Sequence, residues 1–160
     1  MDMSVSECVE LDRLNMTPIL GAAGEAFDFA SREARLAKSL ATNGQLVGVW
    51  REGRLAGYAE LRVTGDRCAL WSVQVHPQHQ RGPVLLGLLR RVAEAIDPTR
   101  VRAVASAVHA SNGKSIRLYR LLGFREVGAC GGKVLFAVGA AELAGRLCTA
   151  GATRAERESA

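Results

Sequence analysis

The first residues with types and spacing suited to chemistry lie between Trp71 and Leu89, in the stretch WSVQVHPQHQRGPVLLGLL. An alternating apolar strand runs into a short polar loop that closes on Gly82, and an apolar helix follows. The first turn of a helix has backbone N–H groups without intrahelical partners, and the positive end of the helix dipole lies behind them. This arrangement suits a bound phosphate group.

A second segment, Asn112 to Phe124, predicts a short helix that carries the phenol of Tyr119 and stops at Gly123. A phenol with a pKa of about 10 can protonate a leaving thiolate of similar basicity without being ionised at neutral pH. Tyr119 is therefore the candidate proton donor. A structural Tyr on the apolar side of a short helix is the alternative.

Together the two segments resemble the GNAT family of acyl-CoA-dependent N-acyltransferases. The family pattern is V-x-V-x-P-x-x-Q/R-x-x-G-x-G/A, followed later by N-x-x-A/S-x-x-x-Y-x-x-x-G-F. The matching positions are Val73, Val75, Pro77, Gln80, Asn112, Ser115, Tyr119, Gly123 and Phe124. Two positions depart from the pattern: Pro83 stands at the first glycine and Leu85 at the second small residue. The resemblance covers residues 45–138.

The resemblance implies a single α/β domain with a mixed central sheet, two splayed parallel strands and flanking helices. It implies transfer of an acetyl group from acetyl-CoA directly to a primary amine of a small molecule or protein, in a ternary complex. The backbone of Val73 and Val75 would hold the pantetheine arm, so residue type would matter little at Gln74. The full set of expected cofactor-binding residues is Val73, Gln74, Val75, Gln80, Arg81, Gly82, Pro83, Val84, Leu85, Asn112, Ser115 and Tyr119.

The altered phosphate loop leaves two interpretations open. Pro83 has no N–H to offer a phosphate, although proline suits a first helical turn. Leu85 either fills the space of the phosphates or, in phase with Leu89 and Val92, faces the core. An active acetyltransferase with a loosened loop therefore competes with a catalytically impaired binding or regulatory member of the family that keeps the fold and binds a CoA-like ligand.

The general base is less clearly marked than the proton donor. The strand from Cys68 to Val75 carries no carboxylate, so Glu60 on the neighbouring strand is the only candidate, with an ordinary solvent-facing carboxylate as the alternative. His76 and His79 are interpreted as loop residues. From the resemblance, residues 27–29 (Phe-Asp-Phe) would lie near the acceptor, and two core Phe side chains are the alternative.

The elements that would position these residues follow from periodicity. Residues 5–13 alternate loosely and predict a first strand. Two short helices follow, one with Pro18 in its first turn and one that starts at Ser31 and stops at Asn43-Gly44. The remaining predicted elements are an antiparallel three-stranded meander over 45–75 with turns at Glu52-Gly53 and Gly65-Asp66, a helix over 83–96, a parallel strand over 101–108, a helix over 112–122, and a hairpin turning at Gly131-Gly132.

Length and composition indicate one globular domain. The chain has 160 residues, 48% hydrophobic and 23% charged. We assign residues 1–140 to the acetyltransferase domain and 141–160 to an extension with a short helix around Leu143 and Leu147, followed by about ten disordered residues. The acidic start of the chain and the lack of a long apolar run predict a cytoplasmic protein without a signal peptide or membrane contact.

The four cysteines form no C-x-x-C pair and have no histidine spacing typical of zinc, so we expect them to be reduced and structural, with no metal site. The net charge of +5 comes mostly from arginine, without the aromatic interleaving typical of nucleic-acid binding, so we expect no nucleic-acid partner beyond a charged tRNA as acceptor. Homodimer formation is an expectation from the resemblance alone. The arginines that flank the two segments, either as phosphate contacts or as merely exposed residues, are Arg81, Arg90, Arg91, Arg117 and Arg120.

Overall fold

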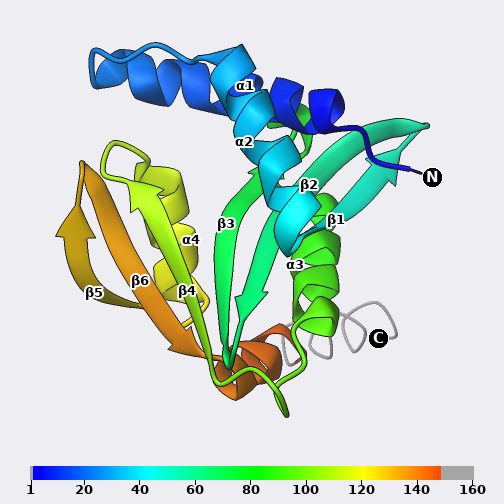
Figure 1. Ribbon diagram of the computed structural model, residues 1–160, viewed down its shortest axis with the longest axis vertical. Coiled ribbons are helices and arrows are strands. Elements are labelled where there is room, and N and C mark those ends of the chain that lie inside the picture. The colour runs from blue at the N-terminus through cyan, green and yellow to red at the C-terminus, as the bar shows by residue number, and fades with distance from the viewer. Residues whose placement is uncertain (1, 149–160) are drawn as a thin grey trace, which may run out of the picture.

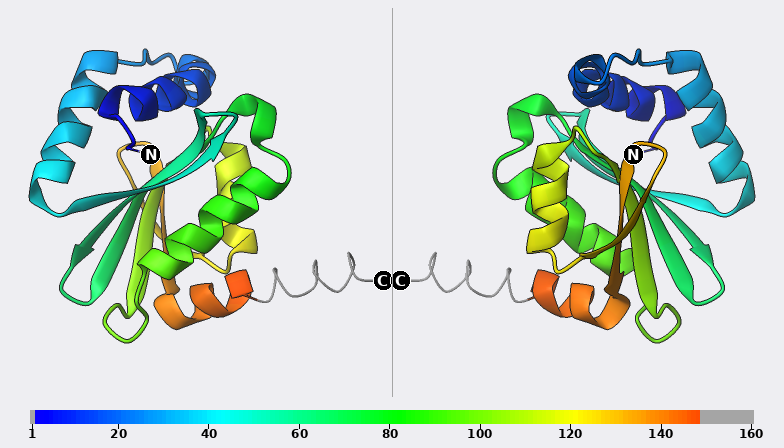
Figure 2. Two further views of the ribbon diagram at one scale, coloured as in Figure 1. Left: turned by 90° about the vertical axis from the view of Figure 1, so that its right-hand side faces the viewer. Right: turned by 90° about the vertical axis from the view of Figure 1, so that its left-hand side faces the viewer.

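A computed structural model describes residues 2–148 and contains a six-stranded mixed sheet with the strand order β1-β2-β3-β4-β6-β5. Helices α1 and α2 cover one face of this sheet, and α3 and α4 cover the other (Figures 1 and 2). The elements are α1 (Val5–Ala22), α2 (Phe29–Thr42), β1 (Gly44–Arg51), β2 (Arg54–Thr64), β3 (Arg67–Val75), η1 (Pro77–His79), α3 (Pro83–Ala95), β4 (Ala103–His109), α4 (Gly113–Leu121), β5 (Arg125–Cys130) and β6 (Lys133–Gly139).

The N-terminal segment is a helix, so the predicted first strand over residues 5–13 is wrong. Ser4 and Glu7 form a capping box, in which each side chain accepts a hydrogen bond from the other's backbone N–H. This pairing satisfies amide groups that the first turn would otherwise leave unpartnered. Cys8, Val9, Leu11 and Asp12 are buried, at the steps of three and four residues that a helix requires.

The boundaries of the two N-terminal helices also differ from those predicted. Pro18 lies inside α1 and not in a first turn. The second helix begins at Phe29, because the side chain of Asp28 accepts a 2.9 Å hydrogen bond from the backbone N–H of Ser31 and caps it. Its end matches the prediction, since α2 stops at Thr42 and Asn43 is its C-cap.

The predicted meander is present. β1 and β2 pair antiparallel through the turn at Glu52-Gly53, and β2 and β3 pair antiparallel through the turn at Gly65-Asp66. Along β2, Ala59 and Leu61 belong to the core under α3, whereas Tyr58 belongs to the smaller core under α1 and α2. The strand is therefore buried on both faces.

The central helix and the strand after it also agree with the prediction. α3 starts with Pro83 in its first turn and buries Val84, Leu88, Leu89 and Val92 against the sheet. It connects β3 to β4, and these two strands pair in parallel. A helix that joins two parallel strands of one sheet is the usual crossover geometry.

The C-terminal part closes the sheet. β5 and β6 form the predicted hairpin, and β6 inserts beside β4. Residues 140–148 are helical, and both Leu143 and Leu147 are 2% exposed within the main core. The expected disordered tail lies outside the described residues. No helix within residues 2–148 is long and apolar enough to cross a membrane.

Candidate active site

β3 and β4 separate after a short contact. Their register contains only the pairs Arg67↔Ala103, Cys68↔Val104 and Ala69↔Ala105. β3 then continues to Val75 and β4 to His109, and the two strands diverge toward α1 (Figure 1). The splayed parallel strands that the family resemblance implied are therefore confirmed.

The edge of β3 offers backbone hydrogen-bonding groups to this wedge. The N–H of His76 donates to the carbonyl of Ala56 on β2, at 2.8 Å. Because groups directed at one neighbour alternate along an antiparallel strand, Val73 and Val75 direct their N–H and C=O groups away from β2 and toward β4. One of these backbone groups already has a partner: the Val75 carbonyl accepts a 3.0 Å hydrogen bond from Asn15 Nδ2 of α1.

Two cavities open from the wedge. The larger has a volume of about 630 Å³ and lies between α1, the end of β3 and the starts of α3 and α4. The smaller has a volume of about 380 Å³ and extends from the wedge toward α2 and the loop before it. Both are lined by Val73, Gln74, Asn112 and Ser115. The two cavities therefore meet where the strands have parted.

The larger cavity ends at the proposed phosphate loop. Gln80 and Leu85 line it, and the residues between them bring the chain to the start of α3. Gly82 is the N-cap of that helix with φ 110°, a conformation that favours glycine, and no side chain caps the first turn. Pro83 removes one N–H from the turn, but the amides of Val84 and Leu85 remain available to an anion.

Leu85 packs against the main core while it lines the wall of the larger cavity. Val84, the other aliphatic residue of the turn, is buried, whereas Arg81, Gly82 and Pro83 are exposed. A Cβ built on Gly82 would meet no heavy atom within 4 Å, so the space above the loop is open. Phosphate binding by the altered loop stays a prediction.

Tyr119 lies at the wedge end of the smaller cavity. Its ring packs edge-on to Phe124 and stacks near Phe136, with centroid separations of 4.8 and 5.7 Å. Its hydroxyl is 3.0 Å from Ser106 Oγ on β4. Burial raises the pKa of Tyr119 to about 12, against an opposing effect of the hydrogen bond with Ser106, so the group is a neutral phenol throughout the physiological pH range.

Asn112 and Ser115 hold the start of α4 at the junction of the cavities. Asn112 Oδ1 accepts a 3.2 Å hydrogen bond from the backbone N–H of Ser115. This is an ordinary helix cap, and it leaves the amide nitrogen of Asn112 available to a ligand. The structure thus shows Asn112 as a helix cap, and its contact with the cofactor stays a prediction.

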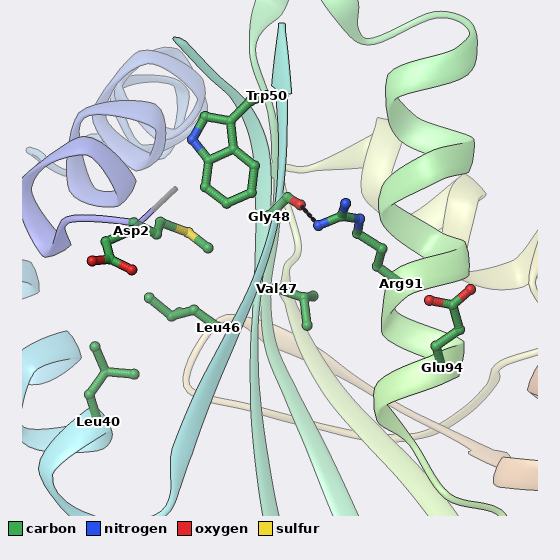
Figure 3. Close-up of a pocket in the computed structure, with 9 residues that line it drawn as sticks. Asp2, Leu40, Leu46, Val47, Gly48, Trp50, Arg91 and Glu94 are labelled. Atoms are coloured by element: carbon green, nitrogen blue, oxygen red, sulfur yellow. Dashed lines mark hydrogen bonds between the residues drawn. The ribbon is translucent and has the colours of Figure 1, made fainter. Parts of the chain in front are cut away.

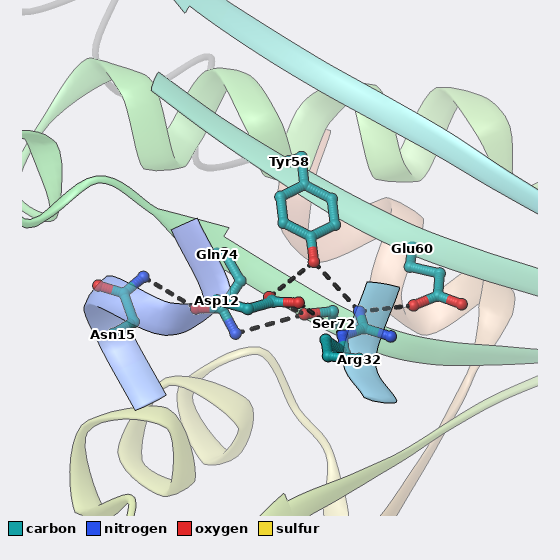
Figure 4. A network of polar contacts seen from close by, with 7 residues as sticks. All are labelled: Asp12, Asn15, Arg32, Tyr58, Glu60, Ser72 and Gln74. Carbon is teal, nitrogen blue, oxygen red and sulfur yellow. Dashed lines mark hydrogen bonds and ion pairs between the residues drawn. The ribbon is translucent and has the colours of Figure 1, made fainter. Parts of the chain in front are cut away.

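A buried polar network lies under α1 and α2, beside the smaller cavity (Figure 4). Arg32 Nε donates to Asp12 Oδ2 at 2.6 Å, and another guanidinium nitrogen of Arg32 pairs with Glu60 Oε2 at 2.9 Å. Tyr58 and Ser72 donate to the other oxygen of Asp12, at 2.6 and 3.4 Å. Burial raises the pKa of Asp12, while Arg32 and Tyr58 oppose this rise.

Asp12 and Arg32 were not found by sequence reasoning, although both line the smaller cavity. The Ser4-to-Glu7 spacing of a capping box was the available signal for Asp12, because a helix from Val5 places Asp12 one turn after the buried Cys8. Nothing in the local pattern around Arg32 indicates its partners. Both carboxylates that it binds come from other elements.

Glu60 is not the solvent-facing carboxylate of the alternative interpretation, since it is only 2% exposed. It is paired with Arg32 and is not among the residues that line either cavity. Its role as the base stays a prediction. Asp12 is the carboxylate of this network that lines the smaller cavity.

The side chain of Gln74 is more engaged than expected. Its oxygen accepts from Asn15 Nδ2 at 2.8 Å, and its nitrogen donates to Ser72 Oγ at 3.3 Å. Gln80 Nε2 donates to Asn15 Oδ1 at 3.1 Å. These amides tie α1 to the end of β3 and to the loop that follows, so residue type has a structural consequence at Gln74.

The remaining candidates divide between the site and other positions. Phe27 and Phe29 both pack against the core under α1 and α2, as the alternative interpretation predicted. Phe27 and Asp28 also line the smaller cavity. His76 caps the short helix η1 by accepting from the N–H of Gln78. His109 and Glu25, which the sequence analysis did not single out, also line the smaller cavity. His109 Nε2 lies 3.5 Å from Glu25 Oε1.

The arginines that flank the two segments have different surroundings in the structure. Arg91 donates a 2.7 Å hydrogen bond to the Gly48 carbonyl of the edge strand β1, beside a separate hollow of about 500 Å³ (Figure 3). That hollow shares no lining residue with the two wedge cavities. Arg120 pairs with Glu126, and Arg81 and Arg117 are exposed. Arg91 therefore has a structural role remote from the expected phosphate.

The sheet order, the splayed pair and the uncapped start of α3 define a GNAT-type acyltransferase fold. The chain matches the model of the acetyltransferase (GNAT) family over residues 10–124 and belongs to that family. The [ribosomal protein bS18]-alanine N-acetyltransferase of Escherichia coli K12 is 32% identical over 76 residues, which are 48% of this chain and 51% of that protein. The chain thus matches about half the length of this curated relative.

Solved structures share the fold at low sequence identity. The PaiA N-acetyltransferase of Thermoplasma acidophilum, in complex with coenzyme A, is 14% identical with a TM-score of 0.68, over 87% of this chain and 96% of that one. The ribosomal-protein-S18-alanine N-acetyltransferase of Escherichia coli is 20% identical with a TM-score of 0.61, over 82% and 86%. The putative acetyltransferase YncA of Salmonella typhimurium, with acetyl-CoA, is 20% identical with a TM-score of 0.59, over 88% and 92%.

Proposed function

We propose that this protein transfers an acetyl group from acetyl-CoA directly to a primary amine of a small molecule or protein, with both substrates bound together. The observation that carries the proposal is the meeting of two cavities in the β3–β4 wedge, the smaller of which is lined by Tyr119. A ternary complex needs two adjoining spaces that share a small opening. Membership of the acetyltransferase family supports this use of the wedge.

The larger cavity suits acetyl-CoA in shape and chemistry. Its apolar wall, the free backbone edge of Val73 and the uncapped first turn of α3 match a pantetheine arm that ends in a diphosphate. Lys114 lines the same cavity and adds a positive charge. The Val75 N–H is the donor placed to polarise a thioester carbonyl, since a fixed dipole there needs no reorganisation.

The smaller cavity suits the amine acceptor. Asp12 and Glu60 carry two negative charges against the single positive charge of Arg32. A primary amine arrives mostly as an ammonium ion at neutral pH. The carboxylates that line this cavity are Asp12, Glu25 and Asp28, and the cations are Arg32, Arg35 and Lys133. Asp12 is the buried carboxylate among them and is the group placed to take up the proton of the ammonium ion.

Tyr119 is the proton donor to the departing thiolate. Acetyl-CoA supplies an activated acetyl group, and the thiolate released from it needs one proton. The phenol remains protonated because burial raises its pKa, and it lines the acceptor cavity beside the junction with the larger one. No covalent intermediate on the protein is required.

Thermal shift and thiol release test this proposal together. Acetyl-CoA at a concentration well above its Kd is expected to raise the melting temperature of the protein, because a ligand that binds only the folded state stabilises it. Release of free thiol from acetyl-CoA is then measured across a panel of amines. The panel should include a peptide with an N-terminal alanine, because a relative acts on ribosomal protein bS18-alanine.

The outcomes separate the two interpretations left open by the sequence. Stabilisation by acetyl-CoA with amine-dependent thiol release supports the enzyme. Stabilisation without thiol release for any amine favours the impaired binding member. Failure of acetyl-CoA to shift the melting temperature contradicts a cofactor role for the wedge altogether.

A further inference from the structure

A side-chain hydrogen bond joins β3 and β4 at the point where their backbone pairing ends. The last registered pair is Ala69↔Ala105, and the next residue on each strand is Leu70 and Ser106. Ser106 Oγ donates a 2.9 Å hydrogen bond to the Leu70 carbonyl. Ser106 therefore lies at the vertex of the wedge and replaces a backbone hydrogen bond of the sheet.

Ser106 is the polar exception on its face of β4. Its neighbours on that face, Val104 and Val108, are buried apolar residues, and Ser106 is itself only 9% exposed. A buried hydroxyl is costly unless it is hydrogen-bonded, so a serine here requires partners. It has two: the Leu70 carbonyl and the Tyr119 hydroxyl, 3.0 Å away.

The proton count at this vertex fixes the direction of both bonds. A serine hydroxyl has one proton, and a carbonyl has none. While Ser106 donates to Leu70, the contact with Tyr119 requires the phenol to donate to Ser106 Oγ. The Tyr119 proton is thus held at the vertex, and no bond between the phenol and another side chain is found among residues 2–148.

The ring of Tyr119 does not depend on Ser106 for its position, because Phe124 and Phe136 pack against it. Ser106 controls only the hydroxyl. A buried phenolate without a donor would be strongly disfavoured, which is the effect of burial on the pKa of Tyr119. A serine that can turn its proton toward the phenolate oxygen reduces that cost.

We propose that Ser106 is a positioning residue that holds the Tyr119 hydroxyl at the vertex and turns its own O–H from the Leu70 carbonyl to the phenolate as Tyr119 gives up its proton. The inference rests on the proposed function, in which Tyr119 protonates the leaving thiolate. In that step the phenol O–H bond breaks and a thiol S–H bond forms. No bond to Ser106 is broken, and the Leu70 carbonyl loses one hydrogen bond.

The test compares variants that differ only in the hydroxyl. Ser106→Thr keeps the hydroxyl, and Ser106→Val replaces it with a methyl group in a side chain of nearly the same volume as Thr. Ser106→Ala removes the hydroxyl from the native serine without adding atoms. Kinetics with acetyl-CoA and an accepted amine should show kcat about 10- to 100-fold lower for Val than for Thr, the usual effect of a hydrogen bond to a charged group. KM for acetyl-CoA should change little, because Ser106 lines neither cavity.

A second readout does not require activity. Proteins that contain 3-fluorotyrosine, whose phenol ionises at lower pH, are titrated by fluorine NMR, with the resonance of position 119 assigned from Tyr119→Phe. Without the serine hydroxyl the phenol at 119 should ionise at higher pH, and Thr should restore the lower value. The melting temperature of each variant shows which of them is folded at the pH used.

The results overturn the inference if Val and Thr titrate alike at position 119. Equal kcat values for these two variants also overturn it. If the wild type transfers no acetyl group to any amine, the proposed function fails, and the titration still decides whether Ser106 stabilises the phenolate. The two failures are therefore distinguishable.

Discussion

The Tyr58 hydroxyl on β2 donates a 2.6 Å hydrogen bond to Asp12 Oδ1 on α1, and this bond joins the first helix to the middle of the meander. The same carboxylate pairs with Arg32 of α2. Three elements are therefore held together by one buried carboxylate beside the smaller cavity (Figure 4). The network positions α1 over the end of β3, where Asn15 reaches the Val75 carbonyl.

Removal of Arg32 should destabilise the fold. Arg32→Met leaves two buried carboxylates, Asp12 and Glu60, without their cation, and breaking a buried pair in this way costs about 3–5 kcal/mol. The free energy of unfolding from urea titrations measures the loss. Arg13→Met is the matched control, because it breaks an exposed pair with Glu10 and should cost at most about 1 kcal/mol.

The stability of the Arg32→Met variant should recover at acidic pH. Burial raises the pKa of Asp12 above its ordinary 3.8, and Arg32, which lowers it, is gone in the variant. The folded variant therefore binds a proton at a pH where the unfolded chain does not, so stability rises as pH falls through the folded pKa toward 3.8. Urea midpoints for wild type and variant between neutral pH and about pH 4 should converge, and a constant gap would contradict the expectation.

Replacement of the proton donor should affect turnover more than binding. Tyr119→Phe removes the phenol oxygen and keeps the ring between Phe124 and Phe136. We expect kcat to fall roughly 100-fold or more, as for the loss of a general acid, with little change in the affinity for acetyl-CoA. Unchanged kcat in Tyr119→Phe would leave Tyr119 a structural residue.

Restoration of an amide at the start of α3 should tighten acetyl-CoA binding. Pro83→Ala returns an N–H to the first turn, next to the exposed Gly82 with φ 110°. One additional hydrogen bond to a phosphate is expected to lower Kd about 10-fold. Calorimetric titration with coenzyme A measures this effect. Pro98→Ala, at an exposed proline that lines neither cavity, serves as the comparison.

The buried and the exposed cysteines should react with a thiol reagent at different rates. Cys8 and Cys68 are buried, and burial raises the pKa of Cys8 to about 12, so its thiol is unionised near pH 8. Cys130 and Cys148 are exposed and free. A disulfide reagent at pH 8 should therefore label two thiols rapidly and all four only after denaturation. Rapid labelling of a third thiol in the folded protein would contradict the buried placement.

The local sequence pattern was sufficient to predict much of the secondary structure of this protein. The meander, the apolar stripe of α3, the Asn112 cap and the Gly123 stop were all predicted, because strand alternation, helical periodicity and turn residues are encoded by neighbours in the chain. The splay of β3 and β4 followed from the family resemblance. The same local reasoning was wrong for residues 5–13, where loose alternation outweighed the capping box from Ser4 to Glu7.

The sequence by itself determined the strands and helices around the wedge and the presence of a phenol on α4. Only the tertiary structure decided that Glu60 is buried against Arg32, that Asp12 lines the smaller cavity, and that Ser106 meets Tyr119 at the vertex. The physical reason is that hydrogen bonds and ion pairs join atoms that are close in space. Asp12 and Tyr58 are 46 residues apart, and no periodicity within either segment specifies that they meet.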